Sequence, residues 1–203
     1  ELAVAAANGA NTTAGFSGID PRTGDGYVYV ETLGGGFGGR AGKDGKDGVQ
    51  VHITNTSNLP VEAIETEYPL RVKSYGFVDN SGGAGRHRGG LGLERILEPV
   101  DHDCVFNGAG ERFTHRPWGL FGGGEGVSGE FLHLDKSGQA SRLPNKPIGV
   151  KISESEAVVI RSPGAGGYGP ADERSIEALA EDAESGKFDT ETLNENYPQW
   201  PPK

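Results

Sequence analysis

Glycine is the residue type that most restricts how this chain can fold. Of the 203 residues, 35 are glycine, and many of them stand in clusters such as residues 34–39 and 164–169. This share is more than double the usual frequency of glycine. Glycine permits positive φ angles and a close approach between two backbone segments, but it weakens the interior of helices and strands. The clusters therefore predict that loops and turns occupy much of the chain.

Short apolar runs of strand length lie between the glycine clusters. The clearest is 49–54, in which apolar and polar residues alternate as in a strand with one buried face. We expect residues 26–170 to form a mainly β domain of the α+β class, either a multi-stranded sandwich or a barrel-like sheet. Further strands are predicted at 27–32, 70–75, 91–97, 104–106, 130–134, 148–152 and 157–160, with a hairpin-like turn at 136–138.

Residues 171–203 are predicted to form a short helical appendage. Ser175 is the expected N-cap of a helix that ends at Gly186, and Asp189 is the expected N-cap of a second helix. The apolar positions of both helices follow helical spacing: Ile176, Leu179, Ala180 and Ala183 in the first, Leu193 and Tyr197 in the second.

Composition restricts the partners and the location of the chain. Its formal net charge is −10, so nucleic acid would be repelled and is not an expected partner. No apolar stretch approaches the roughly 20 residues that span a bilayer, and the N-terminus lacks the pattern of a signal peptide, so no membrane partner is expected. The lone Cys104 fits a reducing compartment, and we therefore predict a cytoplasmic location.

The beginning of the chain is expected to continue from missing upstream sequence. Residues 1–25 show little periodicity, the chain starts with Glu1, and it contains no Met. These features are typical of a fragment or of a processed chain.

The glycine cluster at 34–39, followed by Arg40, has two interpretations. It lets the backbone approach a ligand or another chain, with N–H groups and Arg40 to hold an anion, or it forms turns that need positive φ. It is not a P-loop, because Lys43 is followed by Asp44 rather than by Ser or Thr. The glycines at every third position of 42–48 are interpreted as a polar turn rather than as collagen.

Two other patterns resemble known sites but lack the necessary context. Residues 164–169 match the dinucleotide fingerprint G-x-G-x-x-G, but Pro170 interrupts the step into a helix. Residues 101–104 and His115 include metal-ligand types without the spacing of a zinc site, which favours a polar turn before a buried strand. We therefore expect no metal or cofactor to be bound by this chain alone. There is also no G-x-S-x-G motif for a serine hydrolase.

The densest group of polar side chains lies in residues 52–71. Asn55, Asn58 and Glu62 could hydrogen-bond a polar substrate, and Glu65 could pair with Arg71 or orient a neighbouring group. The alternative is a polar network that only fixes the geometry of the loop.

Several ordered motifs resemble the hydantoinase B/oxoprolinase family over residues 20–197. The residues that carry the resemblance are Thr54, Asn55, Thr56, Asn58, Pro60, Val61, Glu62, Glu65, Tyr68, Pro69 and Leu70, the glycine runs 34–39, 81–85 and 88–92, residues 117–123, and the last loop 163–169. In two places the chain departs from the family pattern. Ala165 interrupts the last run of glycines, and no aspartate separates Gly169 from Pro170.

The resemblance implies a heteromeric, ATP-dependent enzyme. An A-type subunit of kinase-like fold would bind ATP and Mg²⁺ and phosphorylate a carbonyl oxygen. The phosphorylated oxygen is a good leaving group, whereas the free oxygen is a poor one. The B-type subunit, of which this chain resembles the C-terminal part, would then act on the activated intermediate and would not be active alone. A divalent metal (Zn, Mn or Fe) is expected on the missing N-terminal half of the B-type subunit or on another chain.

The resemblance leaves three functions open. The first is hydrolysis of a cyclic amide by a hydantoinase, 5-oxoprolinase or lactamase. The second is carboxylation of a ketone, as in acetone and acetophenone carboxylases, and the third is a non-catalytic role in assembling such a complex. Position and chemistry predict Glu62 and Glu65 as catalytic residues. The predicted substrate-binding residues are Arg40, His52, Asn55, Asn58 and Arg71.

Overall fold

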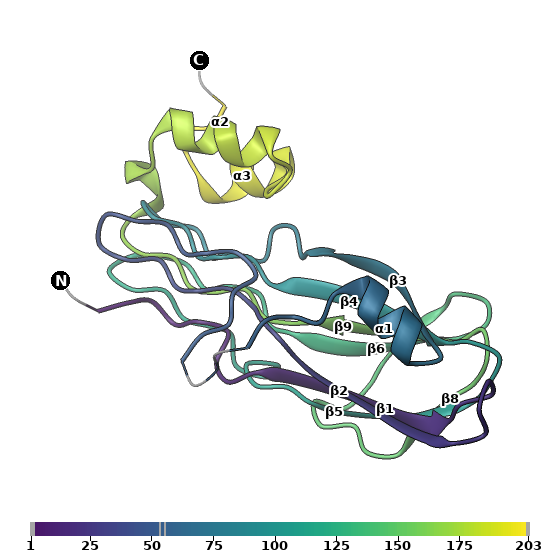
Figure 1. Ribbon diagram of the computed structural model, residues 1–203. Coiled ribbons are helices and arrows are strands. Elements are labelled where there is room, and N and C mark those ends of the chain that lie inside the picture. Colours follow the sequence, from purple (N-terminus) through teal and green to yellow (C-terminus); the bar gives the residue numbers. More distant parts are fainter. Residues whose placement is uncertain (1–2, 53, 55, 202–203) are drawn as a thin grey trace.

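The computed structural model describes residues 3–52, 54 and 56–201, and its largest part is a sandwich of two antiparallel sheets (Figure 1). The first sheet has the strand order β2-β1-β5-β8, formed by β1 (Thr12–Ile19), β2 (Gly26–Leu33), β5 (Cys104–Ala109) and β8 (Val150–Ile152). The second has the order β3-β4-β9-β6-β7, formed by β3 (Leu70–Phe77), β4 (Leu93–Pro99), β6 (Glu130–Leu134), β7 (Ala140–Arg142) and β9 (Ala157–Arg161). The predicted mainly β class is confirmed, as a sandwich rather than a barrel.

The inner faces of the two sheets form the main hydrophobic core. Burial alternates along β1 and β4, as expected when every second side chain faces the opposite sheet. Each large apolar side chain in such a core contributes about 1.5–3 kcal/mol by leaving water. The largest apolar members of this core are Phe16, Tyr29, Leu33, Ile64, Leu70, Leu97, Phe106, Phe113, Phe131, Ile152 and Ile160.

The strand prediction at 49–54 is wrong over the described residues. Val49 makes only an isolated bridge with Gly35, and His52 has a φ of 64°, which an extended strand does not accommodate. Ile53 lies outside the described residues.

Conversely, no strand was predicted in residues 1–25, where β1 lies. The outward positions of β1 include Thr13, Gly15 and Ser17, and such small or polar residues give a weak hydrophobic signal.

A helix absent from the sequence prediction, α1 (Val61–Glu67), follows Pro60 and packs against β3. It buries Ile64 in the main core. Pro60 stands at the N-cap, outside the helix interior where a proline would break a helical hydrogen bond, and the acidic Glu62 in the first turn interacts favourably with the helix dipole. Residues 52–71 were interpreted as a polar segment, so this helix was not predicted from the sequence.

The predicted helical appendage is confirmed. A 3-10 turn, η1 (Ala171–Glu173), leads to α2 (Ile176–Glu184) and α3 (Thr190–Asn196), which lie together at one end of the molecule (Figure 1). Ser175 and Asp189 cap the helices by accepting hydrogen bonds from Ala178 N and Thr192 N. A second core forms here from Leu91, Leu179, Phe188, Leu193 and Tyr197.

The glycine clusters form what we call the glycine layer, made of residues 34–48, 81–92, 117–127 and 162–169. Its segments hydrogen-bond across one another outside the two sheets; for example, Gly90 N donates to Phe37 O and Gly83 N donates to Ala165 O. The backbones are so close that side chains do not fit. A Cβ on Gly89 would lie 1.9 Å from Ala165 O. As at the axis of collagen, only hydrogen fits between the segments.

This packing contradicts one of the two interpretations of residues 34–39. None of the six residues, all described, has a positive φ, so the prediction of turns that need positive φ is wrong. A Cβ on Gly36 would lie 2.2 Å from Gly90 O, so the cluster permits a close approach by another segment of the same chain. Residues 164–169 belong to the same layer, because a Cβ on Gly164 would lie 1.9 Å from Ser81 O.

Buried ion pairs join the appendage to the glycine layer. Asp182 of α2 lies 3.0 Å from Arg88 Nε and 2.7 Å from Arg174 Nη2, and all three side chains are almost fully buried. The second partners of the two arginines come from the segment 42–48: Asp47 lies 2.7 Å from Arg88, and Asp44 lies 2.8 Å from Arg174. The segment interpreted as a polar turn therefore supplies acidic groups to this network.

Candidate functional site

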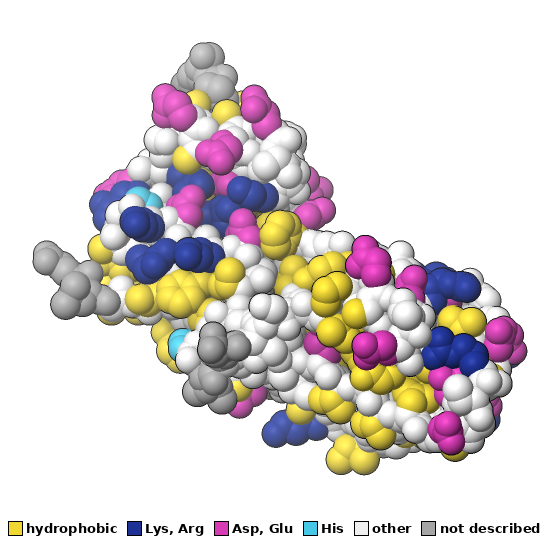
Figure 2. Space-filling view, viewed as in Figure 1, with side chains coloured by type: hydrophobic (Ala, Val, Ile, Leu, Met, Phe, Trp, Pro, Cys, Tyr) yellow, Lys and Arg dark blue, Asp and Glu magenta, His cyan; other side chains and the backbone are white. Residues whose placement is uncertain are grey.

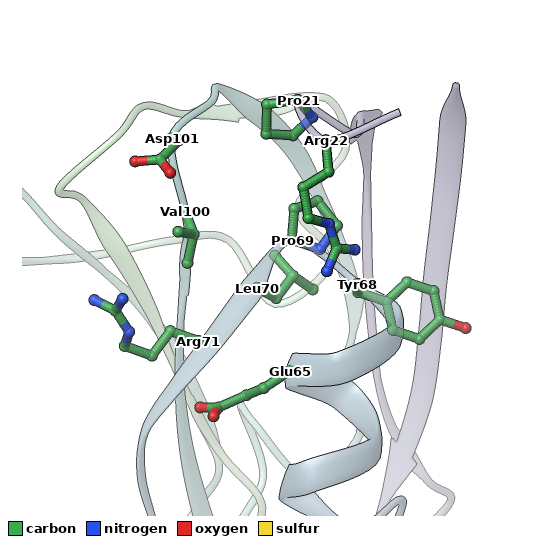
Figure 3. Close-up of a pocket in the computed structure, with 9 residues that line it drawn as sticks. All are labelled: Pro21, Arg22, Glu65, Tyr68, Pro69, Leu70, Arg71, Val100 and Asp101. Carbon is green, nitrogen blue, oxygen red and sulfur yellow. The ribbon is translucent and has the colours of Figure 1, made fainter. Parts of the chain in front are cut away.

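The candidate site is a small pocket where α1 ends and β3 begins. It has a volume of about 230 Å³, and both charged and apolar side chains line it. In Figure 3 the side chains of Glu65 and Arg71 extend to the same side of the pocket, while the ring of Tyr68 points toward the first sheet. The lining residues are Pro21, Arg22, Glu65, Tyr68, Pro69, Leu70, Arg71, Val100 and Asp101.

Arg22, in the turn between β1 and β2, holds one wall of the pocket in place. Its guanidinium donates to both carboxylate oxygens of Asp20, and it also donates to the carbonyl oxygens of Thr66 and Glu67, in the last turn of α1. The hydrogen bonds from Arg22 hold the pKa of Asp20 below its usual value. Arg22 therefore caps the end of α1 and fixes where the following residues enter the pocket.

Glu65 and Arg71 are the two predicted site residues that the structure brings into this pocket. Glu65 Oε1 accepts a hydrogen bond of 2.9 Å from Val72 N, beside a register shift between β3 and β4. Arg71 does not pair with Glu65 as suggested; its Nη1 lies 3.2 Å from Glu98 Oε1. Both side chains are exposed enough to reach a bound molecule.

The remaining predicted residues lie elsewhere. Glu62 is exposed in the first turn of α1, and Asn58 hydrogen-bonds the hydroxyl of Tyr75. His52 is exposed at a positive φ, and Arg40 lies in the glycine layer with its guanidinium 5.1 Å from the centre of the Phe37 ring. Asn55 lies outside the described residues.

A buried group beside the polar segment was not predicted. Arg95 of β4 is fully buried and lies 2.6 Å from Glu31 of β2, so the pair joins the two sheets. Glu31 also accepts hydrogen bonds from Tyr29 Oη and from Leu59 N, which fixes the end of the polar segment. Burial, and then the Glu31 carboxylate, raise the pKa of Tyr29. The sequence signal that could have revealed this pair is Arg95 itself, a charged residue between apolar neighbours at an inward-facing position of a strand.

Residues 101–104 are engaged in contacts within the chain. His102 Nε2 lies 2.7 Å from Tyr27 Oη, and Asp103 pairs with Lys151. Burial raises the pKa of the Cys104 thiol to about 12, so Cys104 stays protonated. Within residues 3–52, 54 and 56–201, no group of three or more His, Cys, Asp or Glu side chains is placed to hold a metal ion. Among the described residues, none of the helices has the length and hydropathy of a membrane-spanning segment.

Comparison with known families gives one match that covers most of the chain. A family model described as Hydantoinase B/oxoprolinase matches residues 1–171. An uncharacterized protein of Methanocaldococcus jannaschii is 41% identical over 86% of this chain and 30% of its own length. The B-type subunit of a putative D-/L-hydantoinase from a Pseudomonas species is 34% identical over 77% of this chain and 26% of its own length.

Solved structures show the same fold. An ATP-dependent caprolactamase from Pseudomonas jessenii superposes with a TM-score of 0.78 at 20% identity, over 94% of this chain and 34% of that chain. A nucleotide-free acetone carboxylase superposes with a TM-score of 0.76 at 21% identity, over 95% of this chain and 30% of that chain. The chain thus spans about a third or less of each of these proteins.

Proposed function

The chain belongs to the hydantoinase B/oxoprolinase family, and we propose that it acts as part of the B-type subunit of an ATP-dependent cyclic-amide hydrolase. The observation that carries the proposal is the match of the family over both the sandwich and the glycine layer. In this proposal an A-type, kinase-like subunit holds ATP and Mg²⁺ and phosphorylates the amide oxygen. The present chain contributes to the site that receives the activated ring, in the cytoplasm, and is inactive alone.

The pocket at α1 and β3 is the part of the chain that we assign to this role. Its volume of about 230 Å³ suits a small ring, and Glu65 has a second carboxylate oxygen beside the one that binds Val72 N. That oxygen would accept a hydrogen bond from the ring N–H or take up a proton from water. Arg71 would donate hydrogen bonds to the oxygens of the activated carbonyl. Glu62, Asn58, Asn55, His52 and Arg40 lie outside the pocket lining or outside the described residues, and their roles stay predictions.

A divalent metal would be held by another part of the complex. The donor set of the described residues does not fit one, because no three His, Cys, Asp or Glu side chains converge. The N-terminal half of the B-type subunit or another chain is the proposed place for Zn, Mn or Fe.

The test uses the complex purified from its native extract with this chain as bait. Intact-mass analysis should find an A-type subunit, and the complex should hydrolyse hydantoin, 5-oxoproline or caprolactam only when ATP is present. Glu65→Gln should lower kcat at least tenfold, because the glutamine side chain cannot take up a proton. Glu67→Gln, an exposed acid on the same helix, is the matched control and should leave kcat unchanged.

The structural likeness to acetone carboxylase favours a second function, carboxylation of a ketone. ATP consumption by the complex that depends on bicarbonate and acetone, without turnover of cyclic amides, would replace the hydrolase proposal with this one. If Glu65→Gln has the same kcat as the wild type in an active complex, the chain is an assembly module whose pocket takes no part in the reaction.

A further inference from the structure

The outer face of the first sheet is nearly free of charge, and large apolar side chains stand on it among small and polar ones. Side chains alternate between the two faces of a strand, so one set of positions on β1, β2, β5 and β8 points away from the core. All four strands are described, and Lys151, at the β8 edge, is the only charged residue among their outward positions. The outward positions are Thr13, Gly15, Ser17, Ile19, Gly26, Val28, Val30, Thr32, Val105, Asn107, Ala109 and Lys151.

Large apolar side chains on this face are left in water. Val28 is 68% exposed, Val30 62% and Ile19 59%, and Val105 adds a fourth exposed side chain on the neighbouring strand. Figure 2 shows hydrophobic side chains over the lower layer of the sandwich, where β1 and β2 lie. An antiparallel sheet with a solvated face normally alternates apolar and polar residues, so this face has the composition of a covered surface.

Gly15, in the middle of this face, is a second and independent observation that indicates what covers the face. A Cβ at Gly15 would lie 3.6 Å from Tyr29 O and from Val30 Cγ2, which is ordinary contact, and its φ is not positive. The chain itself therefore does not require glycine here, in contrast to Gly89, where a Cβ would lie 1.9 Å from Ala165 O. Glycine inside a strand weakens the strand and often marks a place where another backbone approaches closely. Gly15 thus points to a polypeptide lying across β1.

We propose that this outer face is the docking surface for the rest of the B-type subunit, which lies across β1 between Val30 and Val105 with an uncharged, apolar surface of its own. The inference rests on the proposed function. About 70% of the M. jannaschii relative lies beyond the part that this chain matches, so such a protein contains enough further chain to cover the sheet. A second copy is a poorer occupant, because each copy carries a net charge of −10 and two copies repel each other.

The experiment compares wild type, Gly15→Val, Val28→Glu and Gly76→Val as bait in the native extract. Gly76, in edge strand β3 of the second sheet, has nothing within 4 Å of a Cβ, so Gly76→Val adds the same side chain to an open strand position. Circular dichroism and the thermal midpoint first establish that all four proteins fold equally well. Each retained chain is identified from its peptides by its similarity to the unmatched part of the M. jannaschii relative.

The proposal expects wild type and Gly76→Val to retain that chain equally, while Gly15→Val and Val28→Glu retain at least tenfold less. Hydrogen exchange of the purified wild-type complex should be slower in β1, β2 and β5 than in the chain alone. Equal retention by Gly15→Val in a complex that still turns over would overturn the docking surface but leave the proposed function intact. A wild-type dimer that Gly15→Val converts to a monomer would show a second copy as the occupant. A monomeric wild type that retains no such chain would count against both proposals.

Discussion

At the scale of single residues, the buried pair of Glu31 and Arg95 is sensitive to the loss of either partner. The Arg95 side chain is fully buried between Glu31 and the Tyr75 ring, whose centre lies 4.1 Å from the guanidinium carbon. Removing one partner from a buried pair leaves an uncompensated charge, which costs about 3–5 kcal/mol. Replacing both partners by apolar residues avoids that penalty.

We therefore expect Glu31→Leu to lower the free energy of unfolding by about 3–5 kcal/mol, measured by urea denaturation. The double variant Glu31→Leu with Arg95→Met should recover more than half of this loss. Asp103→Asn, which removes the exposed pair with Lys151, is the control and should leave the midpoint unchanged. If Glu31→Leu behaves like Asp103→Asn, the pair does not hold the sheets together.

Sequence reasoning found only part of the candidate site at this scale. Glu65 and Arg71 were predicted together and do lie in one pocket, because the end of α1 at Glu67 is followed closely by the start of β3 at Leu70. Arg40 was predicted to bind substrate beside the glycine cluster 34–39, and it lies in the glycine layer and not among the residues that line the pocket. The buried ion pair described above joins strands of two different sheets, and no local pattern encodes such a distant contact.

At the scale of elements, the buried charges between α2 and the glycine layer decide whether the appendage stays docked. Asp182→Asn would leave Arg88 and Arg174 each without a charged partner on α2, at a cost of about 3 kcal/mol. Hydrogen exchange of α2 and α3 should then become on the order of a hundredfold faster while the sandwich is unaffected. Glu184→Gln, an exposed acid on the same helix, should leave the exchange of both helices unchanged.

The same contact should weaken in acid. Burial alone would raise the pKa of Asp44, but its hydrogen bonds and ion pair with Arg174 hold that pKa below its usual value of 3.8. A carboxyl with a depressed pKa stabilises the folded state above its unfolded pKa, and this contribution is lost as the pH falls through the lower, folded value.

Exchange protection of α2 should therefore be steady from neutral pH down to 3.8 and fall below it. Protection is calculated relative to the intrinsic exchange rate at each pH, which removes the direct effect of acid. In Asp44→Asn the protection should be lower at neutral pH and should change less below 3.8. An Asp44→Asn profile parallel to that of wild type would assign the acid response to another group.

The elements that the sequence predicted are those with a local cause. The caps Ser175 and Asp189 mark α2 and α3, and β2 has clear alternation. The missed β1 and the wrong strand at 49–54 show that alternation of apolar and polar residues does not always predict a strand. β1 is set by its pairing with β2 and β5, whereas the positive φ of His52 ends any extended run there.

At the scale of the whole molecule, the glycine layer lies between the sandwich and the appendage (Figure 1), and contacts between backbones hold its own segments together. Rotation about side-chain bonds can relieve a clash between side chains, but a clash between a Cβ and a carbonyl oxygen moves a whole segment. Gly89 and Gly164 each have a carbonyl oxygen 1.9 Å from the place of a Cβ. The layer therefore tolerates alanine far less than an ordinary core tolerates an added methyl group.

We expect Gly89→Ala to lower the free energy of unfolding by about 3 kcal/mol or more, at the upper end of the range for overpacking. Gly76→Ala is the matched control: it lies in an edge strand with nothing within 4 Å, and it should be neutral or slightly stabilising because alanine restricts the unfolded chain. Urea denaturation measures both. Because Gly89 adjoins Arg88, exchange of α2 should also rise in Gly89→Ala, as the displaced segment carries the arginine away from Asp182. If both variants have the same midpoint, the segments of the layer can separate without loss of stability, and close backbone contact is not what holds the layer together.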